Sequence, residues 1–174
     1  EELFTAISSL KSPSGVFACV ELEESSIKFE DHITKTLVLL DGIQNPTNLG
    51  AVLRNAVAFH FDGILLTSKC ADPTHPESLR AMAGYFFDIP IQRLYTSDIP
   101  YLSSFKAFGL SIDGSAPLNG ASFTQKTLFI LGSEGHGISK EVNDLFPDIR
   151  HIRIPIAPNI DSLNVAVSSG ILFY

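Results

Sequence analysis

Residues 37–60 read LVLLDGIQNPTNLGAVLRNAVAFH, and this stretch decides the fold class. Leu37–Leu40 is a continuous apolar run, which is typical of a strand buried on both faces of a sheet. The turn formers Asp41-Gly42 and Asn45-Pro46 follow directly. We predict that Asn48 then caps a helix, which runs to about residue 60 and has an apolar side. A buried strand, a short turn and an amphipathic helix together predict one unit of an α/β fold.

The alternation of strand and helix continues along the chain. Further strands are predicted at residues 16–20, 63–66, 92–95, 110–112, 128–131 and 149–154. Apolar spacing and two opening prolines predict helices over residues 76–86, 100–108, 138–146 and from 162 onward. This alternation predicts a mostly parallel sheet with helices on both faces. Ligands of such sheets bind in the loops at the carboxyl ends of the strands.

Length and composition limit the class of protein. The chain has 174 residues, a length typical of one domain. Its 45% hydrophobic and 18% charged residues exclude a disordered chain. No apolar run approaches the roughly 20 residues that a membrane-spanning helix needs, and no secretory leader is visible. Because the chain opens on Glu1 and stops at Tyr174 inside an apolar run, we expect it to be a fragment.

Charge and cysteine content add further limits. The net charge of −7 argues against a protein whose whole surface binds nucleic acid. Residues 36–174 carry nine bases against twelve acids, so a local basic patch is compatible with this composition. Residues 21–35 are acidic, serine-rich and weakly periodic, and we interpret them as a linker. Cys19 and Cys70 form no CxxC motif and are expected to be reduced thiols of a cytoplasmic protein.

Three predicted loops, 41–50, 132–137 and 155–164, hold residues that are unusual for simple connections. Loop 132–137 reads GSEGHG and has no lysine, so it is not a P-loop. Its glycines follow the order G-x-x-G-x-G, and Glu134 would repel the pyrophosphate of a dinucleotide. The glycines still allow a ligand to approach the backbone closely, although a flexible strand-to-helix turn explains them equally well.

A hydrolase and a metal enzyme are both poorly supported. Nucleophile and base candidates exist, but the G-x-S-x-G elbow is absent; the candidates are Ser133, His136, Asp161 and Ser162. The five histidines are scattered and form neither H-E-x-x-H nor a Cys–His spacing. The sequence therefore indicates no metal site.

Taken singly, the polar residues of the other two loops have ordinary explanations. Arg54 lies away from the apolar side of its predicted helix, as a solvated arginine commonly does. Ser162 would serve as the N-cap of the last helix, and Asn164 as a polar residue of its first turn. Only the combination of the three loops changes this interpretation.

Together, the loops resemble the three motifs of the SpoU (TrmH-type) RNA ribose methyltransferases, which belong to the SPOUT superfamily. DGIQNPTNLGAVLRNA at residues 41–56 is similar to motif 1, and LGSEGHG at 131–137 to motif 2. The segment from Ile154-Pro155-Ile156 to SLNVA at 162–166 is similar to motif 3. The motifs occur in the family order, each at the end of a predicted strand. The resemblance covers residues 36–174.

The resemblance implies a specific fold and chemistry. It implies a parallel sheet with a deep trefoil knot at its C-terminal end, a rare exception among unknotted chains. S-adenosyl-L-methionine would lie in the knot, held largely by backbone groups of Gly132, Ile154 and Leu163. The enzyme would be a metal-independent homodimer that methylates a ribose 2′-hydroxyl in tRNA or rRNA. The family's active-site positions match Asn48, Arg54, Glu134, Ser162 and Asn164.

The resemblance also suggests a domain organisation and one alternative. Residues 1–20 would be the remnant of an N-terminal RNA-recognition domain, and 36–174 the catalytic domain with its last helix cut at Tyr174. A non-catalytic RNA-binding or dimerising relative of the same fold is the alternative, although the complete set of active-site residues favours an enzyme. Because arginine stays protonated in proteins, Arg54 is easier to interpret as a phosphate ligand than as the base.

Overall fold

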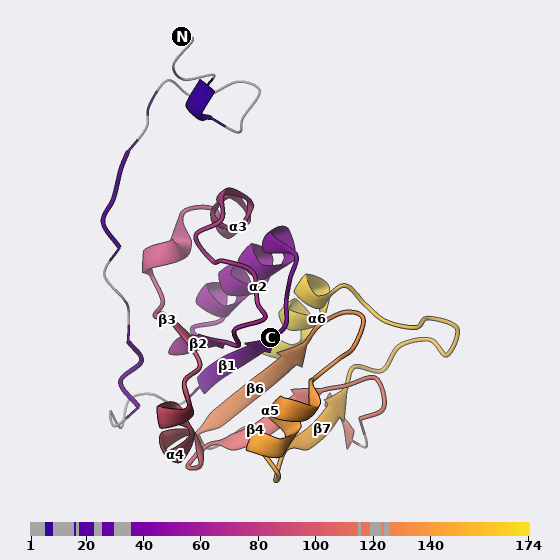
Figure 1. The fold of residues 1–174 in the computed structure, drawn as a ribbon. Helices are drawn as coiled ribbons and strands as arrows, with labels where there is room; N and C mark the ends of the chain where they lie inside the picture. Colours follow the sequence, from indigo (N-terminus) through magenta and orange to yellow (C-terminus); the bar gives the residue numbers. More distant parts are fainter. Residues whose placement is uncertain are drawn as a thin grey trace.

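A computed structural model of the chain describes residues 6–8, 16, 18–22, 26–29, 36–114, 116–118, 123 and 126–174. Its centre is a seven-stranded sheet in the order β3-β2-β1-β6-β4-β7-β5, and every neighbouring pair runs parallel (Figure 1). The strands are β1 (Thr36–Asp41), β2 (Gly63–Leu66), β3 (Ile91–Arg93), β4 (Lys106–Leu110), β5 (Ala116–Pro117), β6 (Thr127–Gly132) and β7 (Arg150–Arg153). The predicted parallel α/β fold is confirmed.

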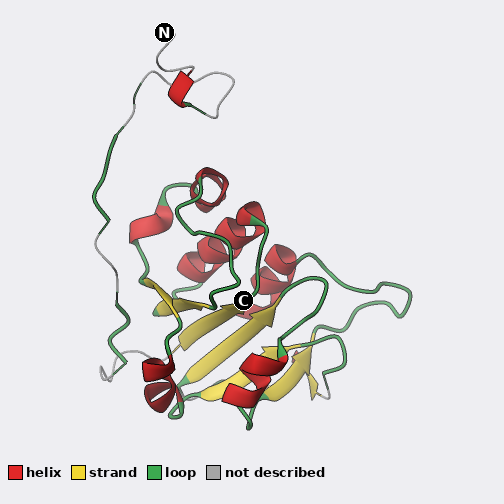
Figure 2. Ribbon diagram, viewed as in Figure 1, coloured by secondary structure: helices red, strands yellow, loops and turns green. Residues whose placement is uncertain are grey.

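Helices cover both faces of this sheet, as Figure 2 shows. The helices are α2 (Pro46–Ala58), α3 (Pro76–Met82), α4 (Ile99–Leu102), α5 (Lys140–Leu145) and α6 (Val165–Phe173), with short 3₁₀ turns η1 (Tyr85–Phe87) and η2 (Thr96–Asp98). α2, α3 and α6 lie on one face, and α4 and α5 lie on the other.

Strand β1 shows why its sequence is apolar without interruption. Val38 and Leu40 join the core that packs against α2 and α6. Leu37 and Leu39 point the opposite way, into the core under α4 and α5. All four side chains are 0% exposed, because alternate residues of a central strand face opposite sides and both sides are covered.

Helix α2 begins earlier than the sequence predicts. The Asn45 side chain accepts hydrogen bonds from the backbone of Thr47 (2.9 Å) and Asn48 (3.1 Å), and Pro46 occupies the first helical turn. An Asn cap before a proline is a strong start signal, because proline lacks the N–H that the first turn leaves unpaired. The prediction that Asn48 caps this helix is therefore wrong. Its side chain is free to reach another loop.

The predicted helix over residues 100–108 is also wrong in its second half. α4 ends at Leu102, where hydroxyls of the next residues bond back to the carbonyls of Pro100 (2.7 Å) and Tyr101 (2.9 Å). Lys106–Leu110 then forms β4, although the sequence predicts a strand only from residue 110. β4 pairs with β6 and β7, so tertiary pairing overrides the local helical spacing.

Other boundaries differ for local reasons. α3 ends at Met82 because Ala83 (φ 56°) and Gly84 (φ 94°) adopt left-handed backbone conformations. α6 begins at Val165 with Asn164 as its cap, so the interpretation of Ser162 as the cap is wrong. The described residues among 16–20 form no strand, and Phe17 lies outside the described residues.

Part of the predicted linker packs against the sheet. Ile27 is buried, and its backbone N–H donates to the side chain of Gln92 (2.9 Å). A Cβ at Gly63 would lie 2.8 Å from the end of the Ile27 side chain, so a larger residue at this position of β2 would displace Ile27. Residues 23–25 and 30–35 lie outside the described residues.

The two cysteines lie in different surroundings. Cys70 is buried, and its thiol donates to the carbonyl of Leu40 (3.1 Å). Burial raises the pKa of this thiol, because the charged form is poorly solvated there. Cys19 is exposed, and both thiols are free. Within the described part of the chain, no helix has the length and apolar character needed to cross a membrane.

Candidate active site

The three loops singled out in the sequence meet at the carboxyl ends of the central strands. β1 and β6 pair in register up to Asp41 and Gly132, so the loops that follow them start side by side. The third loop follows β7 and leads into α6. The loops after β6 and β7 line an open cavity of about 580 Å³. This is the position at which parallel α/β sheets bind their ligands.

A chain of side-chain amides connects all three loops. Asn164 donates through Nδ2 to Oδ1 of Asn48 (3.1 Å), and Asn48 donates through Nδ2 to Oε1 of Glu134. The two contacts join residues that are 116 and 86 positions apart in sequence. One residue from each motif therefore takes part in a single hydrogen-bonded set.

The cap of α6 sets the direction of this chain. Oδ1 of Asn164 accepts from the backbone of Ala166 (2.9 Å) and Val167 (3.4 Å) at the start of the helix. Its NH₂ group must therefore point away from the helix, toward the carbonyl oxygen of Asn48. The NH₂ group of Asn48 is then left to point at Glu134, because an amide has one acceptor end and one donor end. The N-terminus of α6 thus orients the Glu134 carboxylate through Asn164 and Asn48.

The glycine-rich loop closes on itself by backbone contacts. Ser133 and Gly137 exchange two main-chain hydrogen bonds of 3.1 and 2.9 Å. A Cβ on Gly132 would lie 2.0 Å from the carbonyl carbon of Gly137, so a side chain cannot fit without moving the loop. Gly137 has φ +64°, a conformation that favours glycine. These two glycines are therefore required by the loop itself, before any ligand is considered.

The cavity wall combines aliphatic side chains with backbone groups. The aliphatic part includes Leu131, Ile154, Ile156 and Leu163. The charged side chains along it are Asp113, Glu134 and Arg153, and none of the lining residues is lysine. Two carboxylates against one guanidinium favour a ligand that is neutral or cationic over a polyphosphate.

The structure brings most of the predicted site residues together. Gly132, Glu134, Ile154, Ser162 and Leu163 line the cavity. Asn48 and Asn164 adjoin it through the contacts with Glu134 described above.

Arg54 is the exception among the predicted site residues. It is exposed on α2 and does not line the cavity, and its side chain makes no hydrogen bond or ion pair with any residue that the structure describes. The structure therefore shows no contact between Arg54 and Glu134.

Two polar residues of motif 1 have roles that the sequence did not reveal. Asn55 donates from α2 to the carbonyl of Ala166 (2.9 Å) and the hydroxyl of Ser169 (2.8 Å), which ties α2 to α6. Asp41, interpreted above as a turn former, is 3% exposed and fully hydrogen-bonded. Its place at the end of an apolar strand was the available signal, because buried carboxylates require partners. Among the described residues, no group of three or more His, Cys, Asp or Glu side chains is arranged to hold a metal ion.

Comparison with known proteins agrees with this geometry. The profile of the SpoU rRNA Methylase family matches residues 35–174. The chain belongs to this family. An uncharacterized tRNA/rRNA methyltransferase of Synechocystis is 36% identical over 99% of this chain. The 23S rRNA (guanosine(2553)-2′-O)-methyltransferase RlmP of Bacillus subtilis is 30% identical over 100% of this chain. The chain spans 64% of the Synechocystis protein and 69% of RlmP.

Solved structures of SpoU-type proteins share the fold. The AdoMet-bound rRNA methyltransferase of Sinorhizobium meliloti is 30% identical, with a TM-score of 0.75 over 86% of this chain and 59% of its own. A putative RNA methyltransferase of the TrmH family from Porphyromonas gingivalis is 29% identical, with a TM-score of 0.79 over 98% of this chain and 68% of its own.

The amide chain predicts how the site responds to an added carboxylate. Asn48→Asp removes the donor to Glu134 and places two carboxylates side by side, which raises their pKa values in the folded state. The resulting penalty is present above these pKa values and disappears as the pH falls and the pair is protonated. We expect Tm at pH 7 to fall by about 2–4 °C, equivalent to about 1 kcal/mol at this chain length. The deficit should shrink as the pH falls toward about 4, the pKa of carboxyl groups in the unfolded chain, and should be absent below it.

Asn45→Asp is the matched control. It keeps the side-chain oxygen that caps the same helix, so its Tm should stay close to that of the wild type. Thermal unfolding followed by circular dichroism from pH 3 to pH 8 (about the range in which carboxyl groups titrate) checks both variants. A deficit in Asn48→Asp that does not change with pH would contradict the arrangement.

Proposed function

We propose that this chain carries the catalytic domain of an RNA methyltransferase, which uses S-adenosyl-L-methionine to methylate a ribose 2′-hydroxyl in tRNA or rRNA. The observation that carries the proposal is the Asn164–Asn48–Glu134 chain, which joins the three motif loops beside a cavity. RlmP, 30% identical, is named as a 2′-O-methyltransferase, and the Sinorhizobium structure is described as AdoMet-bound. Both names support the reaction and its cofactor.

The residues of the cavity suit this cofactor. A volume of about 580 Å³ lies in the range of small-molecule sites, and the wall mixes aliphatic side chains with backbone groups. The excess of carboxylates over cationic groups suits a positively charged sulfonium. Backbone groups of Gly132, Ile154 and Leu163 would hold the cofactor. When bound, S-adenosyl-L-methionine supplies a methyl group that an oxygen nucleophile can attack in line with the departing sulfur.

The polar residues would position and activate the ribose. Asn48 occupies one oxygen of Glu134, and the other oxygen is left for the 2′-hydroxyl of the substrate. Glu134 would accept the hydroxyl proton or its hydrogen bond, and Ser162 would hold the sugar from the opposite loop. General base catalysis of this kind typically contributes 10²- to 10⁴-fold (about 3–5 kcal/mol). Exposed Arg54 would bind the neighbouring phosphate as a cation.

The knot and the domain boundaries complete the proposal. We place the catalytic domain at residues 36–174, a linker at 21–35, and the remnant of a recognition domain at 1–20. The trefoil knot at the carboxyl end stays a prediction from the motif resemblance. A cytoplasmic location stays a prediction from the two cysteines.

We also propose a homodimer. The two serines of α6 are buried, whereas Val167 and Ile171 on its outer side are 53% and 42% exposed. Phe59 at the end of α2 and Tyr174 at the end of α6 pack edge to face, and both rings are exposed. A second copy would cover this surface.

Light scattering should give twice the monomer mass for the wild-type protein at micromolar concentration. Ile171→Asp should lower the measured mass to that of the monomer, because it places a charge on the apolar surface. A monomeric wild type would contradict the proposal.

Two glycine variants test the cofactor site. Gly132→Ala forces a methyl group against the backbone of Gly137, whereas a Cβ at Gly135 meets no atom within 4 Å. We expect Gly132→Ala to raise the Kd for S-adenosyl-L-methionine at least about tenfold, which is about 1.4 kcal/mol, and Gly132→Val to abolish binding. Gly135→Ala should bind as the wild type does. Calorimetry measures all three, and normal affinity in a folded Gly132→Val protein would refute the assignment.

Arg54 variants separate two chemical roles. Arg54→Ala should nearly abolish methyl transfer and leave the calorimetric cofactor affinity unchanged, because Arg54 lies outside the cavity. If Arg54 binds phosphate, Arg54→Lys keeps the charge, loses the planar fork and retains measurable activity with no new ionisation. If Arg54 is the base, the activity of Arg54→Lys should rise steeply with pH, since lysine is deprotonated more easily.

Single-turnover rates between about pH 6 and pH 10 distinguish these roles, because lysine titrates near the upper end of this range. We expect the phosphate-binding result. Near-normal turnover by Arg54→Ala would remove Arg54 from the reaction. Cofactor binding by the wild-type protein without any methyl transfer to RNA would favour a non-catalytic relative of the same fold.

A further inference from the structure

We propose that Asp41 is a positioning residue, whose buried carboxylate holds the motif 1 and motif 2 loops at the spacing that lets Asn48 meet Glu134. Its relevance to methyl transfer rests on the function proposed above. Asp41 does not line the cavity, so any effect on the reaction must pass through the loops that it joins.

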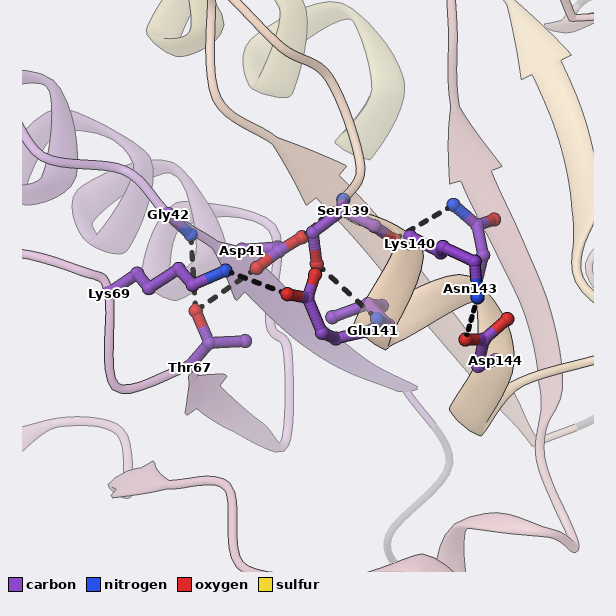
Figure 3. A network of polar contacts seen from close by, with 10 residues as sticks. Asp41, Gly42, Thr67, Lys69, Ser139, Lys140, Glu141, Asn143 and Asp144 are labelled. Carbon is purple, nitrogen blue, oxygen red and sulfur yellow. Dashed lines mark hydrogen bonds and ion pairs between the residues drawn. The ribbon is translucent and has the colours of Figure 1, made fainter.

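The contacts of Asp41 use both of its oxygens. Oδ2 accepts from the backbone N–H of Ser139 (2.7 Å), and Oδ1 accepts from the hydroxyl of Thr67 (3.2 Å). That hydroxyl in turn accepts from the backbone N–H of Gly42 (3.1 Å). Figure 3 shows Asp41 between Thr67 and Ser139, with Gly42 above Thr67. One side chain thus joins segments that follow β1, β2 and β6.

Asp41 binds the glycine-rich loop at both of its ends. At one end its backbone is in register with Gly132, the last residue of β6. At the other end its carboxylate holds Ser139, which also caps α5 by accepting from Val142 (3.3 Å). Glu134 lies between these two fixed points. The carboxylate therefore limits how far the loop, and Glu134 with it, can move from the sheet.

The Asp41 carboxylate also acts on the loop that carries Asn48, the partner of Glu134. Through Thr67 it holds the amide of Gly42, whose φ of +69° turns the chain toward the α2 cap and Asn48. A buried carboxylate with two such donors is costly to leave unpaired, so both contacts persist only if the loops keep this spacing. Lys69 and Glu141 join the segments that follow β2 and β6 by an exposed ion pair of 3.3 Å. Because both side chains are exposed, this pair is expected to contribute little to the stability of the fold.

Three variants distinguish a positioning role of Asp41 from a role in the stability of the fold alone. Asp41→Ala removes both acceptors. Asp41→Asn keeps one oxygen for Ser139 and can donate to the Thr67 hydroxyl, so it should recover most of the loss. Lys69→Ala is the control, because it removes only the exposed ion pair with Glu141, which also joins the segments that follow β2 and β6.

The first measurement is independent of activity. Hydrogen exchange on the folded protein should show faster exchange at Ser139 and Gly42 in Asp41→Ala, near wild-type exchange at Ser139 in Asp41→Asn, and no change in Lys69→Ala. Unchanged exchange in folded Asp41→Ala would overturn the proposal. A wild-type protein that transfers no methyl group would refute the proposed function and leave this result unaffected.

The second measurement is a double-mutant cycle on kcat, at a temperature at which every variant is fully folded. We expect Asp41→Ala to lower kcat by up to about a hundredfold, as misplacement of a reacting group by 1 Å does, with a smaller change in KM for RNA. In an Asn48→Ala background, Asp41→Ala should cost little more, because the contact that it positions is already lost. Full additivity of the two effects, or normal kcat in folded Asp41→Ala, would mean that Asp41 serves stability alone.

Discussion

The pairing of β1 with β6 is the constraint on which the rest of the molecule depends. The register runs without interruption from Thr36 opposite Thr127 to Asp41 opposite Gly132, and both strands are buried on both faces. A slip of one residue would exchange the sides to which Val38 and its neighbours point, so the two cores hold the register. Because the strands are parallel and end together, the loops carrying motifs 1 and 2 start at the same level of the sheet.

From that shared level, the site is assembled by neutral amides and backbone geometry. The cap of α6 orients Asn164, Asn164 orients Asn48, and Asn48 orients Glu134. The ion pairs Lys69–Glu141 and Lys140–Asp144 lie on the exposed surface, where such pairs contribute about 0–1 kcal/mol. Glycines 132 and 137 let the second loop fold back on itself without obstructing the cavity.

Several elements could be predicted because their signals are local. The run Leu37–Leu40 and the runs around β2 and β6 are apolar without interruption, and such runs have few structural alternatives. Residues 103–108 carry no comparable signal, and the helical interpretation fails there because β6 and β7 recruit Lys106–Leu110 into the sheet. The choice of cap at Asn45 over Asn48 was visible in the sequence, since a proline follows only the former. The motif resemblance identified Asn48, Glu134 and Asn164 as site residues, but not the contacts between them.

The sequence by itself determined the fold class, the family resemblance and the residue types of the site, since strand burial and motif spacing are written in short stretches of chain. Only the tertiary structure decided which atoms meet. Asn48 is hydrogen-bonded to Glu134 and Asn164, which lie 86 and 116 residues away in sequence. Asp41, expected to be a turn former, is buried and hydrogen-bonded. Arg54 does not line the cavity. Local patterns fix which face of a strand or helix a side chain occupies. The distance between two loops depends on strand register and on the packing of two cores, and no short stretch of sequence contains that information.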